Sequence, residues 1–268
     1  MNNKINKKTM DTIYERYNRR ELVNPDPLVF LYNYSNPEDR ELVGIIAATL
    51  AYGRVAQILK SVNIILKFLG TTPHKSLLET SKKDISDGLK GFKHRFTTDE
   101  EMIGFLSGIK NVLTEYGTLQ NLFYESSHTQ DKNILPALSK FVQKIKQAGG
   151  IKRSSLLSDP EMNSACKRLN LYLRWMIRND VVDPGGWKKI SAEKLIVPLD
   201  THMYHFGKCY GLTKRNNADM KTAIEITNGL KIFEPNDPTK YDFAITRFGI
   251  RSDMCWENLD ILLENQQH

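Results

Sequence analysis

The chain has 268 residues, of which 40% are hydrophobic and 26% are charged, and its formal net charge is +7. This composition excludes a disordered or low-complexity protein, and the length suffices for one large domain or two small ones. Charges interrupt every apolar stretch before the roughly 18 residues that a membrane helix needs, and we find no secretory signal. Three cysteines cannot form a disulfide framework, so we expect a cytoplasmic protein without a membrane partner.

The positive charge is concentrated in one part of the chain. The stretch 140–178 holds nine Lys and Arg residues but only two acidic residues, so it accounts for the whole net charge of +7. A concentrated basic segment is typical of proteins that bind a polyanion, most often a nucleic acid. A lysine-rich, solvated helix face is the alternative.

Apolar residues recur at helical spacing along most of the chain and alternate as in strands almost nowhere. We therefore predict an all-α protein with short connections rich in Pro, Gly, Asn and Asp. The predicted helices cover 39–50, 99–117, 135–150, 222–228, 241–248 and 253–263. Pro37 is predicted to stop the chain before the first of these helices, and Asn228-Gly229 is predicted to form the C-cap of the helix 222–228. We expect two lobes with a cleft between them, one formed by 36–189 and the other by 1–35 with 190–268.

The segment 165–178 is predicted to be a helix with Ser164 as its N-cap. Lys167 lies in its first turn, and Arg174 lies two turns along the same face. The positive helix terminus and the neighbouring cations disfavour a charged ammonium, which makes the Lys167 amine a candidate nucleophile. A plain solvated basic face is the alternative interpretation.

A second candidate site follows the apolar run 195–199, which leads to Asp200 at the start of a helix that ends at Gly211. The default role of Asp200 is that of an N-cap. A carboxylate in this position is also held ionised and rigid by backbone N–H groups, so it can stabilise a cationic transition state.

These residues resemble the helix-hairpin-helix DNA glycosylase superfamily, to which endonuclease III belongs. The similarity lies in Ser164-Ala-Cys-Lys167-Arg-Leu-Asn170, Val197-Pro-Leu-Asp200-Thr-His202, 41–54 and 240–249. The separation of Lys167 from Asp200 is longer than in endonuclease III and is similar to the archaeal 8-oxoguanine glycosylase branch. Asn163-Ser164-Ala165 stands where the superfamily has Gly-X-Gly, so the hairpin is degenerate. The whole chain also resembles a bacterial family of this length without an assigned activity.

The resemblance implies a two-lobed, all-α fold and a base-excision enzyme that removes an oxidised, purine-type base from damaged duplex DNA. It implies that Lys167 attacks the sugar and forms a Schiff base, which permits strand cleavage, and that Asp200 stabilises the positive sugar. The predicted phosphate-binding residues are Asn163, Ser164, Arg168 and Arg174. Tyr52 or Arg54 is predicted to fill the gap that the flipped base leaves. The predicted contacts to the base itself come from Trp187, Asp242 or His202. Trp187 is alternatively a packing anchor.

Other interpretations remain open. A non-catalytic helical protein that binds DNA or structured RNA needs only the charge of Lys167. A protein-interaction scaffold with an apolar groove needs neither this charge nor a reactive amine. Asp200, His202 and His205 resemble a metal set but lack a clear further ligand, so we predict no metal site. The cysteines are too few and too scattered for the four-cysteine cluster of endonuclease III, so we predict no iron–sulfur cofactor.

Overall fold

A computed structural model describes residues 5–162 and 164–264. In these ranges the fold is all-α, and the strands are confined to a two-stranded antiparallel sheet. The helices are α1 (Lys7–Tyr17), α2 (Pro37–Thr49), α3 (Val55–Leu69), α4 (Pro73–Glu79), α5 (Lys82–Gly88), α6 (Asp99–Tyr116), α7 (Leu119–Ser126), α8 (Leu135–Gly149), α9 (Lys167–Ile177), α10 (Thr201–Cys209), α11 (Met220–Lys231), α12 (Asp242–Ile250) and α13 (Trp256–Glu264).

Short 3-10 helices and a small hairpin complete the fold. The 3-10 helices are η1 (Arg20–Leu22), η2 (Pro27–Asn33), η3 (Pro160–Met162) and η4 (Ala192–Lys194). Strands β1 (Lys93–His94) and β2 (Thr97–Thr98) pair with Lys93 opposite Thr98 and His94 opposite Thr97. No helix in the described ranges is both long and apolar enough to cross a membrane.

The predicted boundaries of α6 and α8 are confirmed, and local capping explains both. The Thr98 side chain accepts a hydrogen bond from the Glu101 N–H, and α6 ends before Gly117, whose φ is 76°. Helix α8 ends before Gly150, which adopts the left-handed conformation that a side chain disfavours. Both ends therefore follow from the residues next to them in the chain.

Two predicted helix boundaries are wrong. Pro37 does not stop the chain before α2 but occupies its first turn, where a missing N–H costs nothing, behind an Asn36 cap. Helix α11 continues past Gly229 to Lys231. Gly229 instead permits close packing, because a Cβ there would lie 2.8 Å from the Leu212 side chain.

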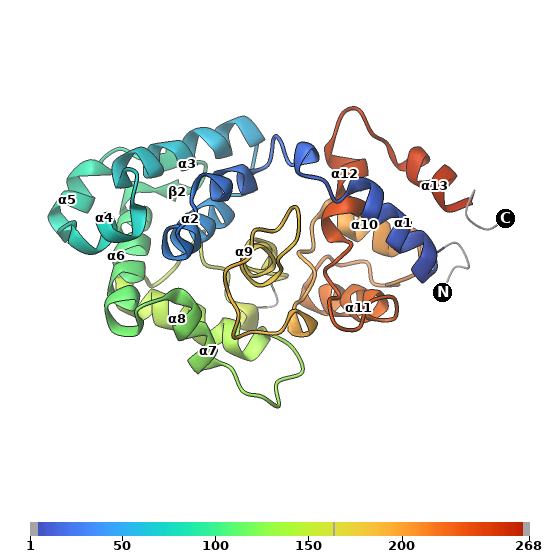
Figure 1. Ribbon diagram of the computed structural model, residues 1–268. Helices are drawn as coiled ribbons and strands as arrows, with labels where there is room; N and C mark the ends of the chain where they lie inside the picture. Colours follow the sequence, from blue (N-terminus) through green and yellow to red (C-terminus); the bar gives the residue numbers. More distant parts are fainter. Residues whose placement is uncertain (1–4, 163, 265–268) are drawn as a thin grey trace.

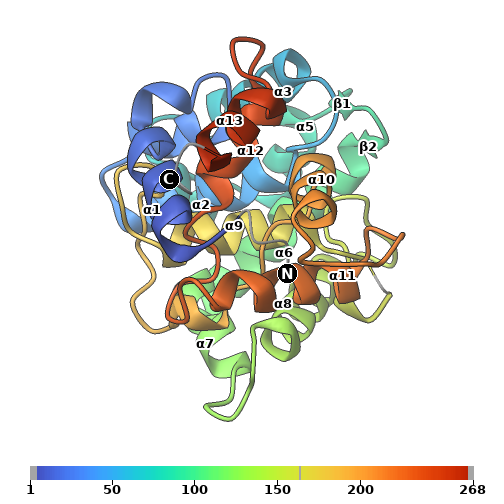
Figure 2. The same cartoon turned by 90° about the vertical axis from the view of Figure 1, so that its right-hand side faces the viewer.

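Helix α9 runs through the middle of the molecule (Figure 1). Helices α2–α8 gather on one side of it, with α2 packed directly on α9, and α1 and α10–α13 gather on the other (Figures 1 and 2). Most of α9 is buried, including Tyr172, Leu173, Trp175 and Met176. Within the N-terminal segment, α1 packs on α12 while η2 packs on α2. The division into 36–189 and 1–35 with 190–268 stays a prediction.

Candidate functional site

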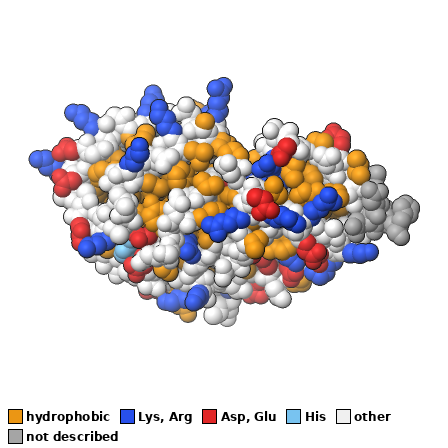
Figure 3. Space-filling model, turned by 45° about the horizontal axis from the view of Figure 1, so that its top comes forward, with side chains coloured by type: hydrophobic (Ala, Val, Ile, Leu, Met, Phe, Trp, Pro, Cys, Tyr) orange, Lys and Arg blue, Asp and Glu red, His pale blue; other side chains and the backbone are white. Residues whose placement is uncertain are grey.

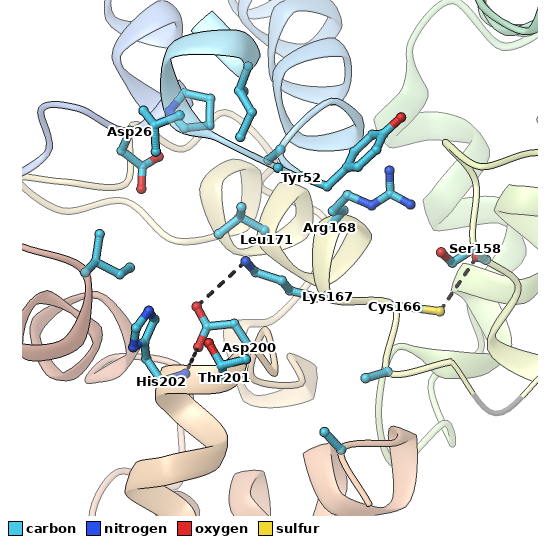
Figure 4. A pocket seen from close by; sticks show the side chains of 18 of the residues that line it. Asp26, Tyr52, Ser158, Cys166, Lys167, Arg168, Leu171, Asp200, Thr201 and His202 are labelled. Carbon is cyan, nitrogen blue, oxygen red and sulfur yellow. Dashed lines mark hydrogen bonds and ion pairs between the residues drawn. The ribbon is translucent and has the colours of Figure 1, made fainter. Parts of the chain in front are cut away.

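The N-terminal ends of α9 and α10 open into a pocket of about 710 Å³ (Figure 4). Its walls come from both sides of α9: the α2–α3 connection with Tyr52 on one side, and the start of α10 and the end of α12 on the other. The pocket also contains Lys167, Arg168 and Asp200, three of the residues that the sequence singled out. Segments far apart in the chain therefore converge on one cavity.

Lys167 and Asp200 face each other across this pocket (Figure 4). The Lys167 Nζ lies 3.7 Å from Asp200 Oδ2. The lysine side chain is 40% exposed and the aspartate side chain 13% exposed, so an amine and a carboxylate are both accessible from the cavity. This pair can exchange a proton and can place a nucleophile beside a fixed negative charge.

The two oxygens of Asp200 have different partners. Oδ1 accepts hydrogen bonds from the backbone N–H groups of His202 at 2.9 Å and Met203 at 2.8 Å, so Asp200 is the N-cap of α10 as predicted. Oδ2 is the oxygen that faces Lys167. The buried run Leu195–Leu199 leads the chain to this position. The helix therefore orients the carboxylate through one oxygen and leaves the other for the pocket.

The start of α9 differs from the prediction. The helix begins at Lys167 itself, and Cys166 occupies the N-cap position without a side-chain capping bond. Ser164 is not the N-cap, since its hydroxyl accepts a hydrogen bond from the Cys166 N–H at 3.2 Å. Cys166 adopts a left-handed conformation with φ 46° and ψ 36°, which is costly for a residue with a side chain. A sharp turn thus directs Lys167 into the pocket.

Cys166 also lines the pocket, and no sequence pattern marks it, because a single cysteine carries none. Its side chain is buried, and its sulfur lies 3.6 Å from the Ser158 carbonyl oxygen. Burial raises the pKa of its thiol to about 11. The thiol is therefore protonated at neutral pH and is unsuited to act as a nucleophile.

Arg168 lines the pocket and holds its wall through backbone contacts, and its predicted phosphate contact stays a prediction. Its Nη1 donates to the Thr49 carbonyl at 2.6 Å, and its Nη2 donates to the Ser155 carbonyl. The guanidinium also lies 4.7 Å from the centre of the Tyr52 ring. These contacts fix α2, α9 and the segment after α8 to one another.

Tyr52 is anchored through its hydroxyl, and its predicted gap-filling role stays a prediction. Its hydroxyl donates to the His94 carbonyl at 2.8 Å and lies 2.7 Å from Thr97 Oγ1. Its ring packs edge-on against the His94 ring. Arg54 is exposed and forms no ion pair with any residue in the described ranges, so its role stays a prediction.

Arg174 does not lie on a solvated face, and its predicted phosphate contact is wrong. It is buried, its Nη2 lies 3.1 Å from Asp183 Oδ1, and its Nη1 donates to Asp242 Oδ2. Arg178 is buried beside it and pairs with Asp180, Asp183 and Asp237. At Arg174 and Arg178 the basic face of α9 is therefore covered by acidic residues of the segment after α9 and of 237–242, whereas its Lys167 end opens into the pocket.

Two of the predicted base contacts are wrong as well. Trp187 is buried, donates through Nε1 to Glu41 at 2.6 Å and packs edge-on against Tyr172, as the packing alternative supposed. Asp242 is buried against Arg174, and burial raises the pKa of its carboxyl to about 6. Neither residue lines the pocket, whereas His202 does, so its base contact stays a prediction.

The loop before α9 links it to α8 through residues 150–166, which include η3. Ser164 lines the pocket, and its predicted phosphate contact is untested. Asn163, the other predicted phosphate contact in this loop, lies outside the described residues. The degenerate hairpin therefore stays a prediction at this position.

The basic stretch 140–178 is not one continuous basic surface. Lys144 pairs with Glu115, and Lys146 lies 3.9 Å from Asp159. With Arg174 and Arg178 buried, the exposed cations of this stretch that form no ion pair with a described residue include Lys152 and Arg153, which lie just before the pocket wall. Part of the excess positive charge of this stretch is therefore buried in ion pairs and does not lie on the surface.

Asp26 is a second acidic residue of the pocket that the sequence analysis missed. Its side chain caps η2 by accepting from the Leu28 N–H, and it lies 3.6 Å from Arg247 Nη2. The Asp26-Pro27 pair is an ordinary helix-start signal, so nothing in the sequence marked it as part of a site. His205, by contrast, packs against Trp256, and the described residues hold no cluster of three or more metal-ligating side chains.

Comparison with known families shows which family the chain belongs to. A family model described as "Protein of unknown function (DUF2400)" matches residues 26–251. The chain belongs to this family. The part that matches DUF2400 contains every pocket-lining residue except Pro25. No curated protein and no solved structure matches the chain.

Proposed function

We propose that this member of the DUF2400 family is a cytoplasmic base-excision DNA glycosylase with AP-lyase activity that removes an oxidised, purine-type base from damaged duplex DNA. One observation carries the proposal: Lys167 and Asp200, far apart in the sequence, meet at 3.7 Å in one pocket. A primary amine beside a fixed carboxylate is the arrangement that Schiff-base chemistry at a sugar carbon requires. The pocket volume, about 710 Å³, is in the range of small-molecule sites and suits an extruded nucleotide.

Lys167 supplies the nucleophile in this proposal. Its neutral amine attacks C1′ of the flipped nucleotide, and the bond between C1′ and the base breaks with its electron pair leaving on the base. Asp200 takes one proton from the amine and passes it to O4′ as the C1′–O4′ bond breaks, while the departing base takes a proton from solvent. A protonated Schiff base between Nζ and C1′ remains. Loss of a proton from C2′ then expels the 3′ phosphate, so strand cleavage follows base removal.

Asp200 has two roles in the same reaction. Its Oδ2 stabilises the positive charge that develops on the sugar as the base leaves, and it accepts a proton from the Lys167 amine. The two backbone N–H groups on Oδ1 hold the carboxylate in place without neutralising the second oxygen. Little reorganisation is therefore needed when the charge forms.

Borohydride trapping tests the proposal directly. The protein is incubated with duplexes that contain an abasic site or 8-oxoguanine, reduced, and examined for a covalent protein–DNA band. The wild type should give the band, and Lys167→Gln should not. Lys75→Gln is a matched control, because Lys75 is 73% exposed on α4 and lies outside the pocket.

The outcomes separate three activities. A band that is lost in Lys167→Gln alone supports the lyase. No band on any lesion, with salt-sensitive DNA binding retained, would instead identify a non-catalytic DNA- or RNA-binding protein or an enzyme without a Schiff base. Weak association that is insensitive to salt would refute nucleic-acid binding altogether and favour a protein scaffold.

A further inference from the structure

A second cavity, of about 440 Å³, lies at the opposite end of α9 from the pocket that holds Lys167. It is formed by the segment 179–184, which follows α9, and by residues of η1, η2 and the start of α2. None of its lining residues lines the Lys167 pocket. The 11 residues of α9 separate the two cavities by roughly 16 Å along the helix axis. The second cavity is therefore a distinct place in the fold.

Arg20 presents a fixed guanidinium to the second cavity. The guanidinium lies over the Tyr32 ring, 3.7 Å from its centre, and both residues line the cavity. The Tyr32 ring is itself held, because its hydroxyl donates to the Val182 carbonyl at 2.6 Å. Arg20 is exposed, and in the described ranges it forms no ion pair and its side chain donates no hydrogen bond. The stacking thus orients the guanidinium and leaves its N–H groups for another acceptor.

Arg40 is the second arginine of this cavity, and it is half-buried. Its Nε and Nη2 donate to the Tyr34 carbonyl at 3.1 and 3.0 Å, and its Nη1 donates to the Pro184 and Gly185 carbonyls at 3.3 and 3.5 Å. A guanidinium has five N–H groups, so at least one remains beyond these four bonds. No carboxylate of a described residue pairs with Arg40, so backbone dipoles hold it in place without cancelling its charge.

Asp180 is the one acidic residue among the described residues that line the second cavity. Its carboxylate accepts hydrogen bonds from the Tyr14 and Asn18 side chains and from two backbone N–H groups, and it pairs with Arg178 at 2.8 Å. These five donors already satisfy the carboxylate. The cavity lining therefore holds two fixed cations that have no acidic partner of their own.

Exposed cations are common on this protein. On the face shown in Figure 3, Lys and Arg side chains stand along the upper edge of the larger part of the molecule. Exposure alone therefore marks no site, and the distinguishing feature of Arg20 and Arg40 is that two oriented guanidiniums line one cavity. Guanidinium groups match the oxygens of a phosphate, and a phosphomonoester carries about two negative charges at neutral pH.

We propose that the second cavity binds a small phosphomonoester, with its phosphate between Arg20 and Arg40. A volume of about 440 Å³ is in the range of small-molecule sites and leaves room for an organic part beside the phosphate. Tyr34 and Val181, which is 63% exposed, supply apolar surface for that part. This binding site goes beyond the proposed glycosylase function and does not rest on it.

Titration calorimetry with phenyl phosphate tests the proposal, because this compound combines a phosphate with an apolar ring. The wild type should bind phenyl phosphate more tightly than inorganic phosphate, and phenol should give no measurable heat of binding. Arg20→Ala should bind phenyl phosphate about 10- to 100-fold more weakly, the range expected for the loss of a hydrogen-bonded charged group. Its melting temperature should stay close to that of the wild type, because the side chain is exposed.

Arg16→Ala is the matched control. Arg16 is also exposed, lies 5.6 Å from the centre of the Tyr17 ring and has no ion-pair partner among the described residues, but it lines a different cavity. Arg16→Ala and Lys167→Gln should both bind phenyl phosphate as tightly as the wild type does.

Three results would overturn the proposal. The first is a wild type that does not bind phenyl phosphate, or that binds it no more tightly than Arg20→Ala does. The second is binding that is lost in Lys167→Gln and kept in Arg20→Ala, which would place the compound in the Lys167 pocket. The third is weaker binding of an undamaged DNA duplex by Arg20→Ala without any binding of phenyl phosphate, which would assign Arg20 to the DNA backbone.

Discussion

Two substitutions can separate the helix cap that Asp200 forms from the catalytic role that we propose for it. Asn caps helices about as well as Asp, so Asp200→Asn should keep the bonds to the His202 and Met203 N–H groups and lose only the charge that faces Lys167. Ala loses both. The ion pair is long and the lysine is 40% exposed, so its contribution to folding should be below about 1 kcal/mol. The cap should contribute a further ~1 kcal/mol, within a range of about 0.5 to 2 kcal/mol.

Catalytic activity, unlike stability, should be lost in both variants. Removal of a positioned acid–base group costs about 10² to 10⁴ in rate, so both Asp200 variants should be nearly inactive in single-turnover cleavage of an 8-oxoguanine duplex. Urea denaturation should show Asp200→Asn close to the wild type and Asp200→Ala about 1 kcal/mol less stable. Retention of activity within tenfold by Asp200→Asn would refute the catalytic role of the charge. Equal destabilisation by Asn and Ala would refute the capping argument.

Two further predictions concern buried charges. Arg174→Ala should lower the free energy of unfolding by about 3–5 kcal/mol, because it leaves the buried Asp242 carboxylate without its ion-pair partner and leaves Asp183 paired with Arg178 alone. A decrease below about 1 kcal/mol in urea denaturation would refute this role of the buried ion pairs. Burial raises the pKa of Glu41 to about 7 from a usual value near 4.5. The folded state therefore binds the Glu41 proton more tightly than the unfolded state does. This difference contributes up to about 3 kcal/mol to the free energy of unfolding. The contribution is fully present below pH 4.5 and is lost as the pH rises through 7. Glu41→Gln should abolish this part of the pH dependence, and identical slopes in both proteins would contradict it.

The accuracy of the sequence predictions depends on how local the responsible interactions are. Helix α6 begins at a Thr98 cap and ends before a glycine with positive φ, and both signals are legible in the chain. Gly229 looks like the same kind of signal, but its neighbour Leu212 lies in another segment and requires the glycine for close packing. A glycine pattern alone does not separate these two cases.

The candidate site shows the same division. The apolar run before Asp200 and the helix after it, which are local features, predict its N-cap role. The sequence also predicts Lys167 in the first turn of its helix, but it carries no signal for the left-handed conformation of Cys166. Asp26 joins the pocket from a distant segment, so no spacing in the chain could reveal it.

The sequence by itself determined that the protein is helical and where helices such as α6 and α8 end, because propensity, periodicity and capping act within a few residues. It also drew Lys167 and Asp200 to notice, through their places near helix starts and through the family resemblance. Only the tertiary structure decided which charged side chains are buried and paired and which are accessible. Arg174 has the sequence signature of a surface cation, and its burial depends on Asp183 and Asp242, which arrive from other parts of the chain. Phe96 is a large hydrophobic residue, yet it is 74% exposed in the turn of the β1–β2 hairpin. Burial and charge pairing are properties of contacts between remote segments, and the fold alone brings those segments together.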